Sequence, residues 1–412
     1  MSLLTRNIAS LGFFQVASHL IALASVPFMA RVLGVSSFGE FVLTQAAMRY
    51  CILFVDFGFL WSATRQIAAS RASEVQVSAI FSRTWVLQWL LVAIVAVLLA
   101  TLLLCIPALR PSLWLCIAGF SMVIGSAAAP TWLLLGLERM NAVAISQGFA
   151  NLLALVLLFV FVDGPGDVAL ALVIYGGALA ATNATLTWWI LRKGLVRWSA
   201  PSRTELLQTA KDGFPVFVST IFVSFYTVLP ALAVGALSSA TAAAYFNVAD
   251  KARAAATSAM QPAFTALLPR MSHLFVHDRR GARILLRRSI VATAGVSGAA
   301  SIVLFFGAEL IVNLVGGQSF VPATSVLKWM SPLPFVVSMS SIASLQILLP
   351  NQKIKQFNGV LMMAGAVSLA SIWPFVQLGA ELGAAQCLLL TELLVCAAMW
   401  RFAILTVLRK DP

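Results

Sequence analysis

Long apolar segments separated by short polar ones give this chain its pattern. Runs such as residues 90–104 show no alternation of apolar and polar positions, which argues against a membrane β-barrel. Such runs are typical of helices that cross a bilayer, each of which needs about 20 apolar residues. The pattern predicts about twelve transmembrane helices, at residues 8–30, 38–60, 84–106, 113–135, 143–163, 168–191, 213–235, 241–268, 290–315, 325–349, 359–379 and 383–406.

Composition supports an all-α integral membrane protein. Of 412 residues, 61% are hydrophobic and only 10% are charged, whereas a soluble domain has about 25% charged residues. So few polar residues cannot cover a water-facing surface, which excludes a cytosolic enzyme, a secreted disulfide scaffold and a disordered chain. The five cysteines lie in apolar runs without a CxxC pair, and we expect them to be core residues.

The distribution of Lys and Arg predicts the orientation in the membrane. The net charge is +13, from 27 basic and 14 acidic residues. If the N-terminus is cytoplasmic, 21 of the 27 cations fall on the cytoplasmic side, as the positive-inside rule requires. We therefore expect a multi-pass protein of the bacterial inner membrane with both termini in the cytoplasm, and no nucleic-acid partner. The longest polar connections are expected at residues 61–83, 192–212 and 270–289.

A faint internal repeat divides the predicted helices into two sets of six. Pro27 and Gly34 in the first half correspond to Pro230 and Gly235 in the second, at spacings of 203 and 201 residues. Repeated six-helix halves are a common plan of transporters, which handle substrate between the halves. The sequence therefore predicts two pseudo-symmetric six-helix bundles, at residues 1–200 and 201–412.

Three charged residues fall near the middle of the eighth predicted helix: Asp250, Lys251 and Arg253. A charge at the bilayer centre costs about 2.5–3.5 kcal/mol on insertion scales, so residues kept there usually face a bundle interior or a wet cavity. Asp250 and Arg253 are three positions apart and are expected to pair, which leaves Lys251 as a surplus cation. The alternative is a misplaced helix boundary, which would put all three in a loop.

Other charges lie in or near predicted spans. Arg49 and Asp56 share one face of the second helix, and a structural ion pair between them is the alternative to a functional role. His19 lies in the first helix, where a core histidine is the alternative, and Arg31 lies near that helix's outer end. Glu309 and Glu392 lie deep in the ninth and twelfth predicted helices, and pairing inside the bundle is the alternative for Glu392.

The charges at these positions would sum to a positive lumen if they line one cavity. The cations are Arg31, Arg49, Lys251 and Arg253, against the carboxylates of Asp56 and Asp250. A positive, water-filled cavity suits an anionic substrate, because phosphate or pyrophosphate stabilises buried cations. The motifs HExxH, GxSxG, CxxC and Walker A are absent from the sequence, so we expect neither an enzyme nor ATP hydrolysis, and no cofactor or metal.

Several segments resemble one known family. They are residues 31–41 (RVLGVSSFGEF), 56–58 (DFG) with Arg65 and Arg71, 130–139 (PTWLLLGLER) and 245–251 (YFNVADK). Together they resemble bacterial polysaccharide flippases, the Wzx-type O-antigen and exopolysaccharide transporters. The resemblance implies the fold of the MATE/MOP transporter superfamily, with two six-helix bundles facing each other in a V. Twelve helices favour this branch over the fourteen-helix flippases of peptidoglycan precursor.

The resemblance also implies a substrate and partners. The substrate would be an undecaprenyl-pyrophosphate-linked oligosaccharide, moved from the cytoplasmic to the periplasmic leaflet by alternating access, and the partners a polysaccharide polymerase and a chain-length regulator. Arg31, Arg49, Lys251 and Arg253 would attract the substrate, and the candidates for ion or proton coupling are His19, Asp56, Asp250, Glu309 and Glu392. One alternative is a drug/cation antiporter of the same superfamily, which would require an acidic lumen. Another is a membrane polymerase or ligase, which would have a large periplasmic loop.

Overall fold

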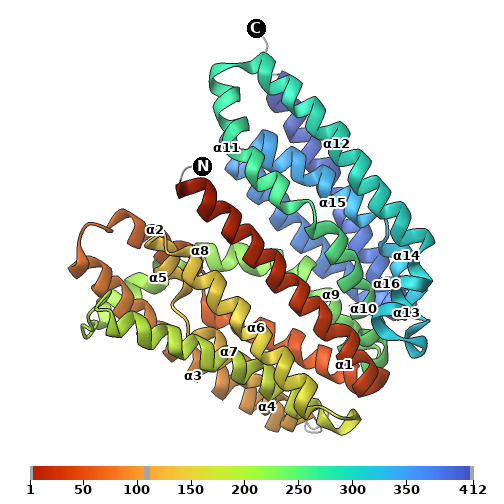
Figure 1. Cartoon of the computed structure of the whole chain (residues 1–412), viewed down its shortest axis with the longest axis horizontal. Helices are drawn as coiled ribbons and strands as arrows, with labels where there is room; N and C mark the ends of the chain where they lie inside the picture. The colour runs from red at the N-terminus through yellow and green to blue at the C-terminus, as the bar shows by residue number, and fades with distance from the viewer. Residues whose placement is uncertain (1–2, 106–111, 409–412) are drawn as a thin grey trace. The chain divides into compact units, whose positions relative to one another are not determined.

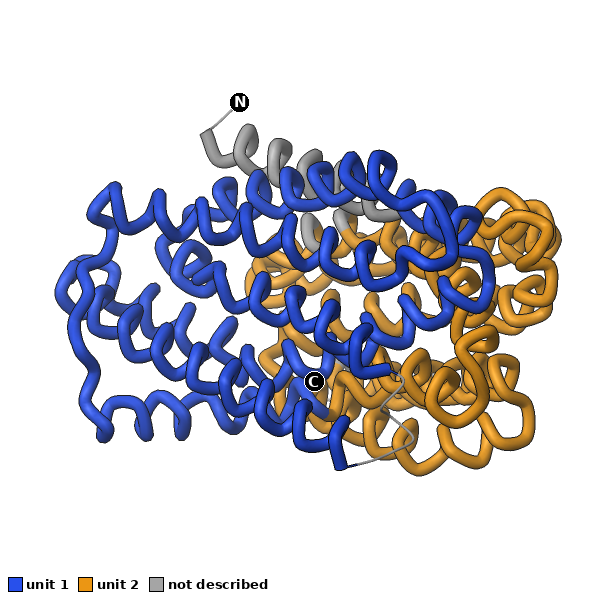
Figure 2. The backbone as a smooth tube through the Cα atoms, turned by 90° about the horizontal axis from the view of Figure 1, so that it is seen from below, with its two compact units in different colours: residues 1–221 blue, residues 222–412 orange. Residues whose placement is uncertain are grey.

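The computed structural model describes residues 3–105 and 112–408, with side chains from residue 24 onward except those at 262, 265, 266, 407 and 408. Helices make up nearly all of this described part, and no strand occurs in it (Figure 1). The chain divides into two compact units, residues 1–221 and 222–412, coloured separately in Figure 2.

The described residues of unit 1 form seven α-helices and the first part of an eighth. α1 contains two predicted helices, because Gly34 (φ 70°, ψ 173°) interrupts the helical backbone between them. The helices are α1 (Leu3–Asp56), α2 (Phe59–Ala69), α3 (Glu74–Cys105), α4 (Leu113–Ala127), α5 (Thr131–Gly136), α6 (Met140–Phe161), the short 3₁₀ helix η2 (Pro165–Asp167), α7 (Val168–Arg192) and α8 (Arg203–Thr227), which continues into unit 2.

Unit 2 follows from the middle of α8. Its last helix, α16, also contains two predicted helices, separated where Ala380 adopts φ 46° and ψ −123°. The helices are α9 (Leu229–Leu237), α10 (Ala240–Ser258), α11 (Gln261–His277), α12 (Arg279–Phe306), α13 (Ala308–Gly316), the 3₁₀ helix η3 (Gln318–Phe320), α14 (Ala323–Met330), α15 (Leu333–Ser341), the π-helix η4 (Ile342–Leu348) and α16 (Ile354–Leu408).

In the described residues, each of the twelve predicted spans falls on one, two or three consecutive helices. Within the described residues, eight helices are long and apolar enough to cross a membrane, and nine if α8 and α9, bent by 56°, form one span. α1 and α16, with 54 and 55 residues, are each long enough for two crossings of about 30 Å. α10 is absent from this apolar set because its polar face lowers its hydropathy.

The three long polar connections expected from the sequence contain much helix. α2 and the start of α3 occupy most of residues 61–83, α8 begins within 192–212, and α11 and α12 fill nearly all of 270–289. Arg, Lys, Gln and Glu are good helix formers, and helices can therefore continue beyond the apolar core into water.

The compact units divide inside α8 rather than after residue 200, because the first part of α8 packs on unit 1. The Phe57 and Phe217 rings stack with centroids 4.5 Å apart. Gln66 of α2 donates a hydrogen bond of 3.0 Å to the Asp212 carboxylate. The Cβ of a residue larger than glycine at position 213 would lie 2.7 Å from the Phe57 carbonyl oxygen, so α8 approaches this turn closely.

Candidate functional site

α10 carries the charged residues that the sequence singled out. The helix begins after Ser239, whose hydroxyl accepts a hydrogen bond of 3.1 Å from the Ala242 N–H. Asp250, Lys251 and Arg253 lie in its middle, so the alternative that placed them in a loop was wrong. The Arg253 guanidinium donates from Nη2 at 2.6 Å and from Nε at 3.0 Å to Asp250 Oδ1, which confirms the predicted pair.

A second acidic side chain, on α16, lies within electrostatic range of Arg253. Glu392 is half-buried and interacts electrostatically with Arg253. Tyr226, near the end of α8, interacts in turn with Glu392. The Arg253 side chain is only 18% exposed, and two carboxylates from different helices therefore compensate its charge. The structure thus brings together Asp250, Arg253 and Glu392, which the sequence could not place in one cluster.

Lys251 lies next to the pair of Asp250 and Arg253 on α10. Its side chain is half-buried and has an interaction of its own. Other side chains of α10 are small or apolar and buried, among them Ala244, Val248 and Ala249. This packing holds the backbone of α10 against unit 2 and leaves the polar face partly open.

In unit 1, Asp56 has a different partner from the one considered in the sequence. Gln88 of α3 donates from Nε2 to Asp56 Oδ1 at 3.5 Å, and Gln88 Oε1 accepts from Trp132 Nε1 at 3.3 Å. Gln88 is 2% exposed and Trp132 is 3% exposed. No ion pair joins Arg49 to Asp56 in the described part of the chain, because residues seven apart lie about 10 Å apart along a helix and Arg49 is exposed.

The remaining predicted site residues lie apart from these clusters. Arg31, on α1, is exposed and takes part in an interaction of its own. Glu309 is exposed in the first turn of α13, which follows Gly307 after α12 ends at Phe306. The His19 side chain lies outside the described residues. The sequence missed Gln88, although a glutamine within an apolar run was a usable signal.

Comparison with known proteins identifies the family. The family model described as "Polysaccharide biosynthesis protein" matches residues 4–275, about two thirds of the chain. The chain belongs to this family. A relative from Escherichia coli (strain K12), named "Putative O-antigen transporter", is 31% identical over 399 residues, covering 97% of this chain and 96% of the relative. A relative of the same name from Shigella dysenteriae is 27% identical over 395 residues, covering 96% and 98%.

Solved structures agree on the fold of this polysaccharide biosynthesis protein. An inward-facing multidrug resistance MATE transporter of the MOP superfamily matches with a TM-score of 0.72 at 13% identity, covering 94% of this chain and 97% of that one. The lipid II flippase MurJ in an inward closed conformation matches with a TM-score of 0.74 at 11% identity, covering 96% and 87%. At these identities the likeness shows the fold alone.

The predicted family and fold class are therefore confirmed. The chain is a multi-span membrane protein of this family, and its all-α fold is that of the solved MATE transporter and of MurJ. The prediction that it is not an enzyme is also confirmed, since the relatives are named as transporters rather than as catalysts of a chemical reaction.

Proposed function

We propose that this chain flips an undecaprenyl-pyrophosphate-linked oligosaccharide from the cytoplasmic to the periplasmic leaflet of a bacterial inner membrane, by alternating access. The observation that carries the proposal is the half-buried pair of cations, Lys251 and Arg253, in the middle of α10. The relatives named as O-antigen transporters support a saccharide substrate. The excess of Lys and Arg in predicted cytoplasmic segments supports the orientation, with both termini in the cytoplasm.

Arg253 has the chemistry to bind the pyrophosphate. A guanidinium presents several N–H donors in a plane and pairs bidentately with phosphate oxygens. In the described structure two of these donors are directed at one carboxylate oxygen of Asp250. A pyrophosphate carries more charge than Asp250 and would accept these hydrogen bonds in its place. Asp250 thus pairs with Arg253 only while substrate is absent.

The exchange of Asp250 for pyrophosphate at Arg253 would also couple transport to proton movement. Protonation of Asp250 or Glu392 would free Arg253 for the substrate, and deprotonation would restore the internal pairs. Asp56, hydrogen-bonded to Gln88, is a separate candidate in unit 1. His19 and Glu309 remain candidates from the sequence alone. Arg31 and Arg49 add positive charge on α1 and would attract the anionic substrate, and we propose a polysaccharide polymerase and a chain-length regulator as partners.

The test replaces the α10 cations. We expect Lys251→Ala combined with Arg253→Ala to lower surface polysaccharide at least tenfold, which corresponds to about 1.4 kcal/mol or more of lost interaction. Lipid-linked oligosaccharide should accumulate in the cytoplasmic leaflet. Arg288→Ala is the matched control, because Arg288 is an exposed cation on α12. Undiminished export by the double variant at equal membrane levels contradicts the proposed role of these cations.

The MATE-like fold keeps a drug/cation antiporter as the second candidate. Efflux of cationic dyes from intact cells separates the two functions, because a flippase of an anionic lipid does not expel a cationic dye. Deletion of the protein also distinguishes a flippase from a polymerase or ligase. Loss of the flippase leaves the lipid-linked unit in the cytoplasmic leaflet, whereas loss of either enzyme leaves it in the periplasmic leaflet.

A further inference from the structure

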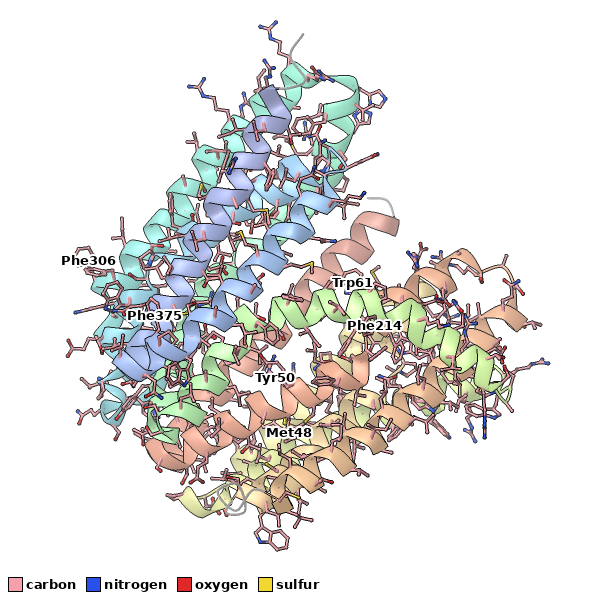
Figure 3. The ribbon with its side chains drawn as sticks, turned by 180° about the vertical axis from the view of Figure 1, so that it is seen from behind. Met48, Tyr50, Trp61, Phe214, Phe306 and Phe375 are labelled. Carbon is pink, nitrogen blue, oxygen red and sulfur yellow. The ribbon has the colours of Figure 1, made fainter. Side chains whose placement is uncertain are left out.

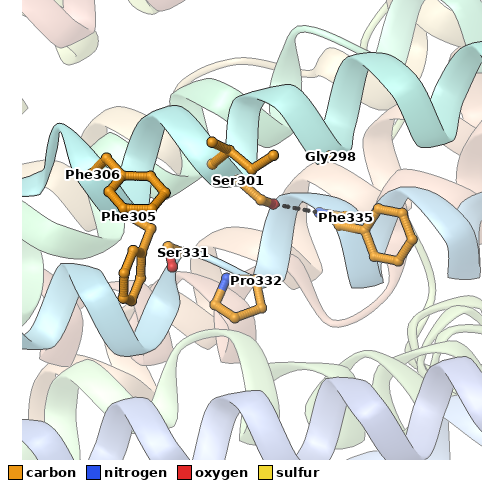
Figure 4. A pocket seen from close by; sticks show the side chains of 8 residues that line it. Gly298, Ser301, Phe305, Phe306, Ser331, Pro332 and Phe335 are labelled. Atoms are coloured by element: carbon orange, nitrogen blue, oxygen red, sulfur yellow. Dashed lines mark hydrogen bonds between the residues drawn. The ribbon is translucent and has the colours of Figure 1, made fainter.

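An apolar groove of about 390 Å³ runs along the surface of unit 2 between α12 and the break that separates α14 from α15 (Figure 4). Gly298 and Ser301 line one wall, and Pro332 and Phe335 line the other. Phe305 and Phe306 lie at one end, where Phe306 is 81% exposed and points away from the helices in Figure 3. The groove is thus open along its length, and its volume is that of a small-ligand pocket.

The two hydroxyls in the groove are already satisfied by the backbone. Ser301 Oγ accepts a hydrogen bond of 3.3 Å from the Phe335 N–H, drawn in Figure 4. The Ser331 hydroxyl donates at 2.7 Å to the Lys328 carbonyl oxygen. No other polar side chain lines the groove. Its occupant must therefore be apolar where it contacts the walls.

The groove opens onto the lipid phase. α12 and the segment Ala323–Leu348 are both long and apolar enough to cross a membrane. Large apolar side chains of α12 are exposed next to the groove, among them Ile302 at 60% and Val303 at 62%. In a bilayer such side chains contact hydrocarbon, so a hydrocarbon chain is the molecule available to fill the groove.

A cation marks the end of the groove that lies near the membrane surface. Lys328 lies about 8 Å along the helix from Ala323, where the span begins, and one turn before Ser331. It is exposed, and no acidic side chain pairs with it among the described residues. Helical side chains lean toward the N-terminus, so the ammonium extends toward the headgroups while the groove extends toward the bilayer core. Trp329, 47% exposed, suits the same interfacial depth.

We propose that this groove is a binding site for an anionic phospholipid. One acyl chain lies between Gly298 and Phe335, and the phosphate binds Lys328. The neighbouring helix α13 carries the acidic residue Glu309 and packs against α14. No ion pair joins Glu309 to Lys328 in the described residues, so the Lys328 ammonium is available to a lipid phosphate. This site belongs to unit 2 alone and is separate from the α10 cluster proposed for transport.

Substitutions can separate the two parts of the site. A Cβ at position 298 would lie 3.9 Å from Phe335 Cδ2, an ordinary contact, so Gly298→Leu fills the groove without displacing the backbone. Gly295 lies about one turn earlier on α12 and has nothing within 4 Å of such a Cβ, which makes Gly295→Leu the matched control. Lys328→Gln removes the headgroup contact and leaves the groove unchanged.

The experiment measures lipids retained by the purified full chain in nanodiscs of equal parts phosphatidylglycerol and phosphatidylcholine, by native mass spectrometry. Wild type and Gly295→Leu should retain phosphatidylglycerol preferentially. Lys328→Gln should lower that preference about fivefold, the effect of one cation near a membrane surface. Gly298→Leu should lower retention of both lipids.

Equal retention by Gly298→Leu and Gly295→Leu overturns the acyl-chain site, and an unchanged preference in Lys328→Gln overturns the headgroup contact. A dimer of the wild type that Gly298→Leu dissociates means that a second copy of the chain covers the groove, and this also overturns the proposal. Since no transport is measured, failure here leaves the proposed flippase activity untouched.

Discussion

Replacing Gly176 with alanine is expected to destabilise unit 1 severely, whereas the same change at the next residue, Gly177, should have little effect. A Cβ at position 176 would overlap Ser121 Oγ and the backbone N of Met122, because α7 packs directly against α4 there. The Ser121 hydroxyl cannot move aside freely, since it donates at 2.6 Å to the Ala118 carbonyl oxygen. A Cβ at position 177 meets nothing within 4 Å.

The approach of α4 and α7 is reciprocal. A Cβ at Gly125 of α4 would lie 2.8 Å from the Gly176 carbonyl oxygen and 2.9 Å from the Ala180 backbone N. Small residues at a helix–helix contact allow backbones to approach closely, which is the main source of association between helices in lipid. Overpacking typically costs about 1–3 kcal/mol, and contact with backbone atoms on both helices favours the upper end or more.

Thermal unfolding in detergent checks this prediction. The Gly176→Ala variant should show a lowered unfolding temperature and a reduced membrane level, with Gly177→Ala close to wild type. Because the two substitutions add the same methyl group to adjacent positions of α7, differences in helix propensity cancel between them. Equal unfolding temperatures would show that α4 and α7 are farther apart in the membrane than in the structure.

The sequence predicted the helices well, because apolar segments of the length of a membrane are unambiguous. It also separated the first two helices between residues 30 and 38, where Gly34 interrupts α1 with a positive φ. It did not show that helices continue through the polar connections, as they do in residues 61–83 and 270–289. Hydropathy detects contact with lipid, whereas helical hydrogen bonding continues into water, so polar helical ends look like loops.

Prediction of the site succeeded only for local contacts. The pair of Asp250 and Arg253 follows from the spacing of three residues on one helix. The electrostatic interaction of Arg253 with Glu392 joins α10 to α16, and the hydrogen bond between Asp56 and Gln88 joins α1 to α3. Such contacts depend on how helices pack, and periodicity along one helix carries no information about its neighbours.

Replacing each of two buried glutamines, Gln88 and Gln346, with leucine should change the unfolding temperature in opposite directions. Gln88 accepts from Trp132 and donates to Asp56, so Gln88→Leu leaves an indole N–H and a carboxylate without this partner. The loss should cost about 1–3 kcal/mol for each group. Gln346 is fully buried in η4, and neither its Nε2 nor its Oε1 has a hydrogen-bond partner in the described structure. Gln346→Leu removes this unpaired amide and should therefore raise the unfolding temperature.

The opposite expected effects of Gln88→Leu and Gln346→Leu raise the question of why a glutamine occupies position 346. η4 is a π-helix, a conformation often found at functional sites, and an unpaired amide there costs stability that leucine would not. Measuring unfolding temperature and export together separates the explanations. A stabilised Gln346→Leu variant that loses export indicates that the amide finds partners in another state of the transport cycle. If Gln346→Leu instead lowers the unfolding temperature as Gln88→Leu does, the amide is paired in the resting state, and the expectation of stabilisation is wrong.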